Sequence, residues 1–102
     1  MNNNRRKALK SLIKQLEEVY EEFENLKSDC DEISQALTDI RDEEEESFDN
    51  LPEGIQESER GEKMQEVIEY LDSAIEELES IDIEEQLNYI EMTTEYINNA
   101  IE

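Results

Sequence analysis

The chain has 102 residues, of which 31 are acidic and nine are basic, so its formal net charge at pH 7 is −22. It has no histidine and one cysteine, which excludes histidine-based catalysis, histidine metal ligands and any intrachain disulfide bond. The negative charge also opposes direct binding of nucleic acid, because phosphate groups require a basic surface.

The charges are unevenly distributed along the chain. Residues 1–14 contain five of the nine basic residues and no acidic residue, and all 31 acidic residues follow. No stretch is apolar enough for a membrane span, and charged residues interrupt the segment that follows the basic N-terminus. These features and the single cysteine predict a cytoplasmic protein that does not associate with a membrane.

A first helix is predicted over about residues 5–48, with Asn4 as its N-cap. Apolar residues recur there at alternating spacings of three and four, which places them along one side of a helix, as in a coiled coil. This predicted apolar seam consists of Leu9, Leu12, Leu16, Val19, Phe23, Leu26, Cys30, Ile33, Leu37 and Ile40.

A turn is predicted over about residues 49–57. Pro52 disfavours a helical conformation at the residue before it, and Gly54 permits a left-handed backbone. We expect the apolar residues Phe48, Leu51 and Ile55 to fold back over the helix ends.

Two further helices are predicted over about residues 58–80 and 83–101. The seam of the second helix is Met64, Val67, Leu71, Ala74, Leu78 and Ile81, widened by Ile68 and Ile75. The seam of the third helix is Ile83, Leu87, Ile90, Thr94, Ile97 and Ile101. The seam changes phase near Asp82, where Asp82 and Glu85 are spaced as in a capping box, which favours a break. A continuous helix that rotates toward a second partner is the alternative.

These elements predict an all-α, coiled-coil-like, single helical domain over residues 1–102. The sequence leaves two arrangements open, an elongated antiparallel hairpin and a three-helix bundle. Ile13 and Tyr20, like Ile68 and Ile75, make the apolar stripes wider than a two-helix contact needs. A homodimer would cover the surplus apolar surface.

Catalysis has little support in the sequence. The absence of histidine and the position of Cys30 in the seam argue against nucleophilic catalysis. One enzymatic alternative rests on two acidic motifs. Glu17, Glu18 and Glu21 form one, Glu69 and Asp72 form the other, and together they resemble the magnesium-binding motifs of MazG-type nucleotide pyrophosphohydrolases. Such patterns also arise by chance in so acidic a chain. We therefore expect a protein that is not an enzyme and binds no metal or cofactor.

The acidic charge itself suggests a function. Thirty-one carboxylates spread along a rod of about 65 Å would approach the charge density of duplex DNA. Such a surface predicts a basic protein partner, with the acidic segment Asp42, Glu43, Glu44, Glu45 and Glu46 supplying charge. The adjoining residues Phe48, Asp49, Leu51 and Ile55 would complete the partner-binding site. The alternative is a structural helical module, an assembly or adaptor protein whose acidic surface is only solvated.

The segment Phe48-Asp49-Asn50-Leu51-Pro52-Glu53, followed by Ser58-Glu59-Arg60-Gly61-Glu62, resembles a recurring segment of small acidic helical proteins from Gram-positive phages and prophages. The resemblance covers about residues 40–80. It implies a mobile-element origin and the host cytoplasm as location. Small acidic phage proteins often inhibit host enzymes or defence systems, so the resemblance favours a DNA-mimicking inhibitor of a basic, nucleic-acid-handling or defence protein.

Overall fold

The computed structural model describes all 102 residues and confirms the all-α class. Its four helices are α1 (Asn3–Asp49), α2 (Glu53–Gln56), α3 (Glu59–Glu79) and α4 (Ile83–Ile101). The residues form two compact units. Unit 1 comprises Met1–Asp29 with Asp82–Glu102, and unit 2 comprises Cys30–Ile81. None of the helices combines the length and hydropathy that crossing a membrane requires.

The long helix α1 contains no glycine or proline and is rich in residues with high helix propensity. It begins earlier than predicted. The backbone N–H of Arg5 donates to Oδ1 of Asn2 over 2.9 Å, so Asn2 rather than Asn4 satisfies a free donor of the first turn. Asn4 lies inside the helix instead.

The turn after α1 contains the short helix α2, which the sequence pattern did not indicate. Pro52 precedes it in an extended conformation, with φ −56° and ψ 146°. The side-chain amide of Gln56 donates to the carbonyl oxygen of Phe48 over 3.1 Å and so caps the end of α1. Gly54 does not adopt the left-handed backbone that glycine permits, because no residue of the chain has a positive φ. Gly54 is part of α2 and needs no special backbone conformation.

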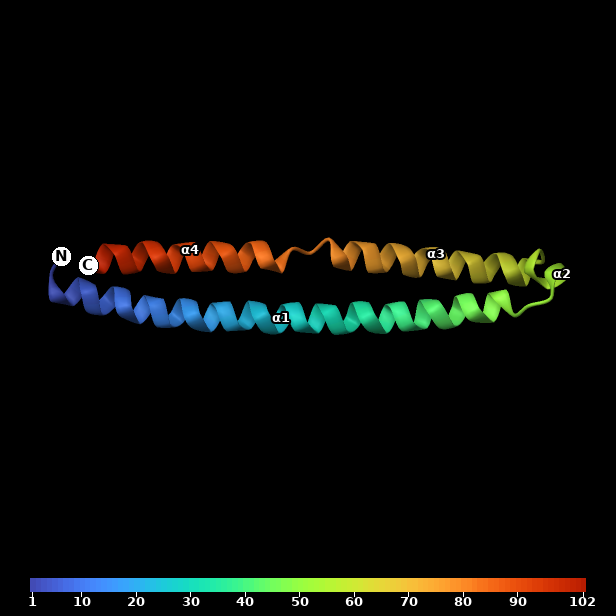
Figure 1. The fold of residues 1–102 in the computed structure, drawn as a ribbon, viewed down its shortest axis with the longest axis horizontal. Coiled ribbons are helices and arrows are strands. Elements are labelled where there is room, and N and C mark those ends of the chain that lie inside the picture. The colour runs from blue at the N-terminus through green and yellow to red at the C-terminus, as the bar shows by residue number, and fades with distance from the viewer. The chain divides into compact units, whose positions relative to one another are not determined.

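Unit 1 is an antiparallel pair formed by α4 and the N-terminal part of α1 (Figure 1). Arg6 Nε donates to the carbonyl oxygen of Ile101 over 3.2 Å, and Lys27 forms an ion pair with Glu84. Early residues of α1 therefore contact the end of α4, and later residues contact its start. Ile83 and Leu87 are the most deeply buried apolar residues of the chain.

Unit 2 pairs the C-terminal part of α1 with α3, and α2 lies at their junction (Figure 1). Gly61, in the first turn of α3, is buried. A Cβ atom at Gly61 would overlap the backbone of Gln56, so the close approach of α2 and α3 requires glycine there. Each unit is therefore an antiparallel pair of helices, formed by α1 and α4 in unit 1 and by α1 and α3 in unit 2.

The residues of α1 that are half-buried repeat with a period of seven, but only part of the predicted seam is among them. One inner row contains Leu9, Leu16, Phe23, Cys30 and Leu37, as predicted. The second inner row lies four residues after the first and contains Ile13, Tyr20, Lys27, Ser34 and Arg41. The other half of the predicted seam, which we call the outer row, is exposed by between 38% and 53%: Leu12, Val19, Leu26, Ile33 and Ile40.

Part of the predicted seam is also exposed in α3, whereas the predicted seam of α4 is not. In α3 the half-buried residues include Ile68 and Ile75, whereas Val67 and Ala74 are exposed, as is Ile81 beyond the end of α3. In α4 all six residues of the predicted seam are buried or half-buried. The second inner row of α1 is selected because its polar members, Tyr20, Lys27 and Arg41, each bond to the paired helix.

The break between α3 and α4 lies where the change of phase predicts it. Helix α3 ends at Glu79, and the side chain of Asp82 accepts a hydrogen bond from the backbone N–H of Glu85 over 3.1 Å. Asp82 is thus the N-cap of α4, and the alternative of one continuous helix is wrong.

Candidate protein-binding surface

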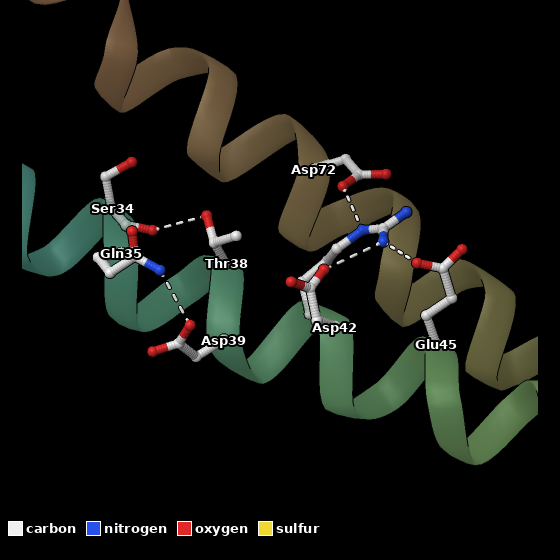
Figure 2. Close-up of polar contacts among 8 residues, drawn as sticks. Ser34, Gln35, Thr38, Asp39, Asp42, Glu45 and Asp72 are labelled. Carbon is white, nitrogen blue, oxygen red and sulfur yellow. Dashed lines mark hydrogen bonds and ion pairs between the residues drawn. The ribbon is translucent and has the colours of Figure 1, made fainter.

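Arg41 is the centre of charge in unit 2. Its guanidinium group donates from Nε to Oδ1 of Asp72 on α3 over 2.8 Å, and also forms ion pairs with Glu45 and Asp42 on its own helix (Figure 2). The Arg41 side chain is only 23% exposed, so the bond to Asp72 is partly shielded from water. The hydrogen bond to Asp72, followed by that to Glu45, raises the pKa of Arg41, and the guanidinium therefore stays charged.

The acidic segment predicted as a binding site, Asp42 to Glu46, is divided by this arrangement. Asp42 and Glu45 are engaged by Arg41, whereas Glu43, Glu44 and Glu46 form no ion pair with a lysine or arginine. Glu43 and Glu46 are also exposed, and Glu44 is half-buried. The segment therefore offers fewer available carboxylates than its sequence implies, because a cation four residues before Glu45 pairs with it along the helix.

The apolar residues predicted beside the segment are also divided. Phe48 and Leu51 are half-buried at the end of α1, as expected for residues that cover a helix end. Ile55 is 41% exposed on α2, so its expected role in covering the helix ends is wrong. Asp49 is exposed as the last residue of α1.

Unit 1 contains a second polar contact between paired helices. The hydroxyl of Tyr20 donates to Oε1 of Glu91 over 2.8 Å. This hydrogen bond is the largest cause that raises the pKa of Tyr20; burial and the nearby carboxylates Glu91, Glu24 and Glu84 act in the same direction. An open hollow of about 370 Å³ lies beside this contact and is lined by Leu16, Glu17, Tyr20, Ile90, Glu91 and Thr94.

The polar contacts and the outer row lie on opposite flanks of each helix pair. Each residue of an α-helix advances by about 100°, so a residue three positions after an inner-row residue lies on one side of it, and a residue four positions after lies on the other side. Because the paired helices are antiparallel, equal offsets in the two helices fall on the same flank of the pair. In unit 2 the outer-row residues Ile33 and Ile40 thus share a flank with Val67 and Ala74 of α3, whereas Arg41 and Asp72 lie on the other.

The apolar flank of unit 2 has an acidic border. Glu32, Asp39 and Glu43 of α1 lie next to the outer row by helical spacing, and Glu66 and Glu77 of α3 occupy the corresponding positions. All five residues are exposed. The exception is the end of the flank nearest α2, where an open hollow of about 420 Å³ is lined by Glu44, Glu59, Arg60, Lys63, Met64 and Val67.

Acidic residues do not gather into a metal site. No group of three or more cysteine, aspartate or glutamate residues is placed so that it could hold a metal ion. Of the two acidic motifs considered for a pyrophosphohydrolase, Glu18 and Glu21 belong to unit 1, and Glu69 and Asp72 belong to unit 2. Arg41 already occupies the carboxylate of Asp72.

No protein-family model matches the chain, and neither does any curated protein sequence or solved structure. The candidate surface therefore rests on the geometry of the chain alone. Sequence reasoning missed the importance of Arg41 and Lys27, although both continue the spacing of Ile13 and Tyr20 at intervals of seven.

Proposed function

We propose that this chain is a non-enzymatic interaction protein that binds a basic partner protein. The observation that carries this proposal is the availability of its carboxylates. No charged side chain is buried, and the ion pairs engage Asp42, Glu45, Asp72 and Glu84, although the chain has 31 acidic residues. A surface of that kind attracts a cationic partner quickly and holds it in a salt-sensitive way.

The preferred partner is a nucleic-acid-handling or defence protein, which the acidic surface inhibits by occupying its DNA-binding cleft. Support comes from the abundance of exposed carboxylates and from the sequence resemblance to phage proteins. The exposed carboxylates of the acidic segment, Glu43 and Glu46, would contribute to the contact, with Ile55 nearby. This function needs no cofactor, metal ion or membrane.

The test is a tagged pull-down from bacterial lysate, in which bound proteins are released by rising salt. We expect one basic nucleic-acid-binding protein to elute between about 50 and 200 mM salt, where such contacts weaken steeply. The protein should also compete with duplex DNA for that partner. Recovery of no basic partner, or binding without competition, would contradict the proposal.

Variants in which glutamate is replaced by glutamine show which carboxylates bind the partner. The variant Glu43→Gln/Glu44→Gln/Glu46→Gln leaves the ion pairs of Arg41 intact and should weaken binding. The control Glu18→Gln/Glu21→Gln/Glu22→Gln removes the same charge from another part of α1 and should weaken binding less. The control also covers the enzymatic alternative, which predicts a magnesium-dependent nucleotide hydrolysis that Glu18→Gln or Glu21→Gln abolishes.

The exposed outer row favours a second candidate function, a structural helical module that assembles with itself. Leucine, isoleucine and valine repeated every seven residues are typical of helix-helix contacts. This alternative predicts a homodimer and no salt-sensitive partner. Sedimentation at several concentrations distinguishes the two.

A further inference from the structure

We infer that the apolar flank of unit 2 is a docking groove for a basic amphipathic helix of the partner protein. This inference rests on the proposed function and deepens it by naming the form in which the basic partner is recognised. The groove is defined by Ile33 and Ile40 on α1 and by Val67 and Ala74 on α3, with Ile81 just beyond the end of α3.

The apolar side chains of the groove are exposed. Ile33 and Ile40 are each 53% exposed, and Val67 and Ile81 are 44% and 55% exposed. Ile33 and Ile40 on α1 are separated by seven residues, as are Val67 and Ala74 on α3, so they repeat at the heptad spacing of a helix-helix contact. Burying such side chains removes apolar surface from water and so favours an occupant.

The helical form of the occupant follows from the geometry. Two antiparallel helices with apolar rows on one flank form a groove between them, and a third helix fills such a groove with its own apolar stripe. The opposite flank lacks this property, because Arg41 and Asp72 occupy it with a charged contact. Only the apolar flank of unit 2 can therefore accept the apolar stripe of a docking helix.

The basic character of the occupant follows from the border of the groove. Glu32, Asp39 and Glu43 lie along one side and Glu66 and Glu77 along the other, and none of them forms an ion pair with a lysine or arginine. A helix with lysine or arginine beside its apolar stripe would neutralise both sides. Basic residues that would repel a cationic helix, Arg60 and Lys63, lie only at the end of the groove nearest α2.

The same border argues against a second copy of this chain as the occupant. Two such grooves placed together would bring ten carboxylates to one interface, and like charges in proximity are unfavourable. Nucleic acid is disfavoured in the same way. The apolar rows and the acidic border therefore select one class of ligand, an apolar helix with cationic edges.

The test uses a synthetic helix of three heptads with leucine at the apolar positions and lysine beside them, and measures its affinity by fluorescence anisotropy. Two further peptides serve as controls, one with glutamate in place of lysine and one of the same composition with scrambled order. We expect only the ordered lysine peptide to bind. Equal binding of the scrambled peptide would overturn the inference, because it would show attraction by charge alone.

Variants of the protein locate the site. Ile33→Asn/Ile40→Asn should weaken the affinity about tenfold or more, as loss of central apolar contacts does. Met92→Asn removes a side chain that is 49% exposed outside the groove and should leave the affinity unchanged. Similarly, Glu43→Gln/Glu66→Gln/Glu77→Gln should weaken binding more than Glu69→Gln/Glu76→Gln/Glu79→Gln, which removes the same charge. Equal affinities in either comparison would contradict the assignment.

Self-association is measured on the same samples by sedimentation. A wild-type dimer that Ile33→Asn/Ile40→Asn converts to a monomer would overturn the inference, since a second copy would then occupy the groove. Failure of the peptide to bind, with a salt-sensitive partner still recovered from lysate, would refute the groove and spare the proposed function. Peptide binding without any such partner would support the groove and refute the proposed function.

Discussion

Arg41 joins the two helices of unit 2 by donating a hydrogen bond from Nε to Oδ1 of Asp72, 2.8 Å away. Arg41→Gln should lower the midpoint temperature of thermal unfolding, because it removes this bond and leaves Asp42, Glu45 and Asp72 without their cation. Arg60→Gln removes the same charge where no ion pair exists and serves as the control. Circular dichroism at low and high salt tests this, and the difference between the two variants should shrink as salt screens the charges.

The two glycines provide a matched pair of substitutions. Gly61→Ala should destabilise the protein by about 1–3 kcal/mol, because the added methyl group overlaps the backbone of Gln56. Gly54→Ala meets no atom within 4 Å and lies in α2, so it should be neutral or stabilise by up to about 1 kcal/mol. Urea unfolding measures both values, and equal effects would show that α2 and α3 are not in close contact.

The N-cap of α4 depends on the side-chain oxygen of Asp82. Asp82→Ala should cost about 0.5–2 kcal/mol of stability, because the N–H of Glu85 loses its acceptor. Asp82→Asn keeps a carbonyl oxygen at that position and should cost less. If both variants unfold at the same urea concentration as the wild type, α4 does not begin at this cap.

Substitutions at Leu87, which is in the core, and at Leu26, which is in the outer row, should differ in their effect on stability. Leu87 is 5% exposed, so Leu87→Ala should destabilise by about 2–5 kcal/mol through lost apolar contacts and a residual cavity. Leu26 is 52% exposed, and Leu26→Ala should cost about 0.5 kcal/mol or less. A large cost at Leu26 would mean that the outer row is buried in solution.

The contact between Tyr20 and Glu91 predicts a dependence on alkaline pH. Folding raises the pKa of Tyr20 above its ordinary value of 10.0, chiefly through the hydrogen bond to Glu91. The stability from this bond is therefore fully present below pH 10 and is lost as the pH rises through the higher pKa of the folded state.

Ultraviolet absorbance titration of the tyrosines measures this shift. The wild type should show a tyrosine that ionises later than it does in the Glu91→Gln variant. Tyr20→Phe should remove that late component and leave the remaining titration in place. A late component that survives Tyr20→Phe would assign the raised pKa to another residue.

The sequence predicts local features of this chain well. Asp82 and Glu85 are three residues apart, and their contact depends only on that spacing, so the cap of α4 follows from the sequence. The six seam residues of α4 fall into two rows, and both rows are buried or half-buried, whereas Tyr89, Met92 and Tyr96 lie outside them and are exposed. In α1 and α3 a third row also contains apolar residues, Ile13 and Tyr20 in α1 and Ile68 and Ile75 in α3, and periodicity alone does not show which two rows face the paired helix.

Contacts between distant residues decide that choice. Tyr20, Lys27 and Arg41 bond to Glu91, Glu84 and Asp72, and these bonds turn the outer row of α1 toward solvent. The acidic segment was misjudged for a related reason. Its sequence suggests five equivalent carboxylates, but Arg41 engages Asp42 and Glu45 and leaves the others available.

The outer row faces solvent while the inner rows pack against the paired helix, and thiol alkylation distinguishes the two. In a Cys30→Ser background, Ile33→Cys places a thiol in the outer row, and Leu37→Cys places one in an inner row. With iodoacetamide at low protein concentration, the thiol at position 33 should react almost as fast as in urea-unfolded protein, and the thiol at position 37 much more slowly. Equal protection at both positions, or faster reaction at position 37, would contradict the claim.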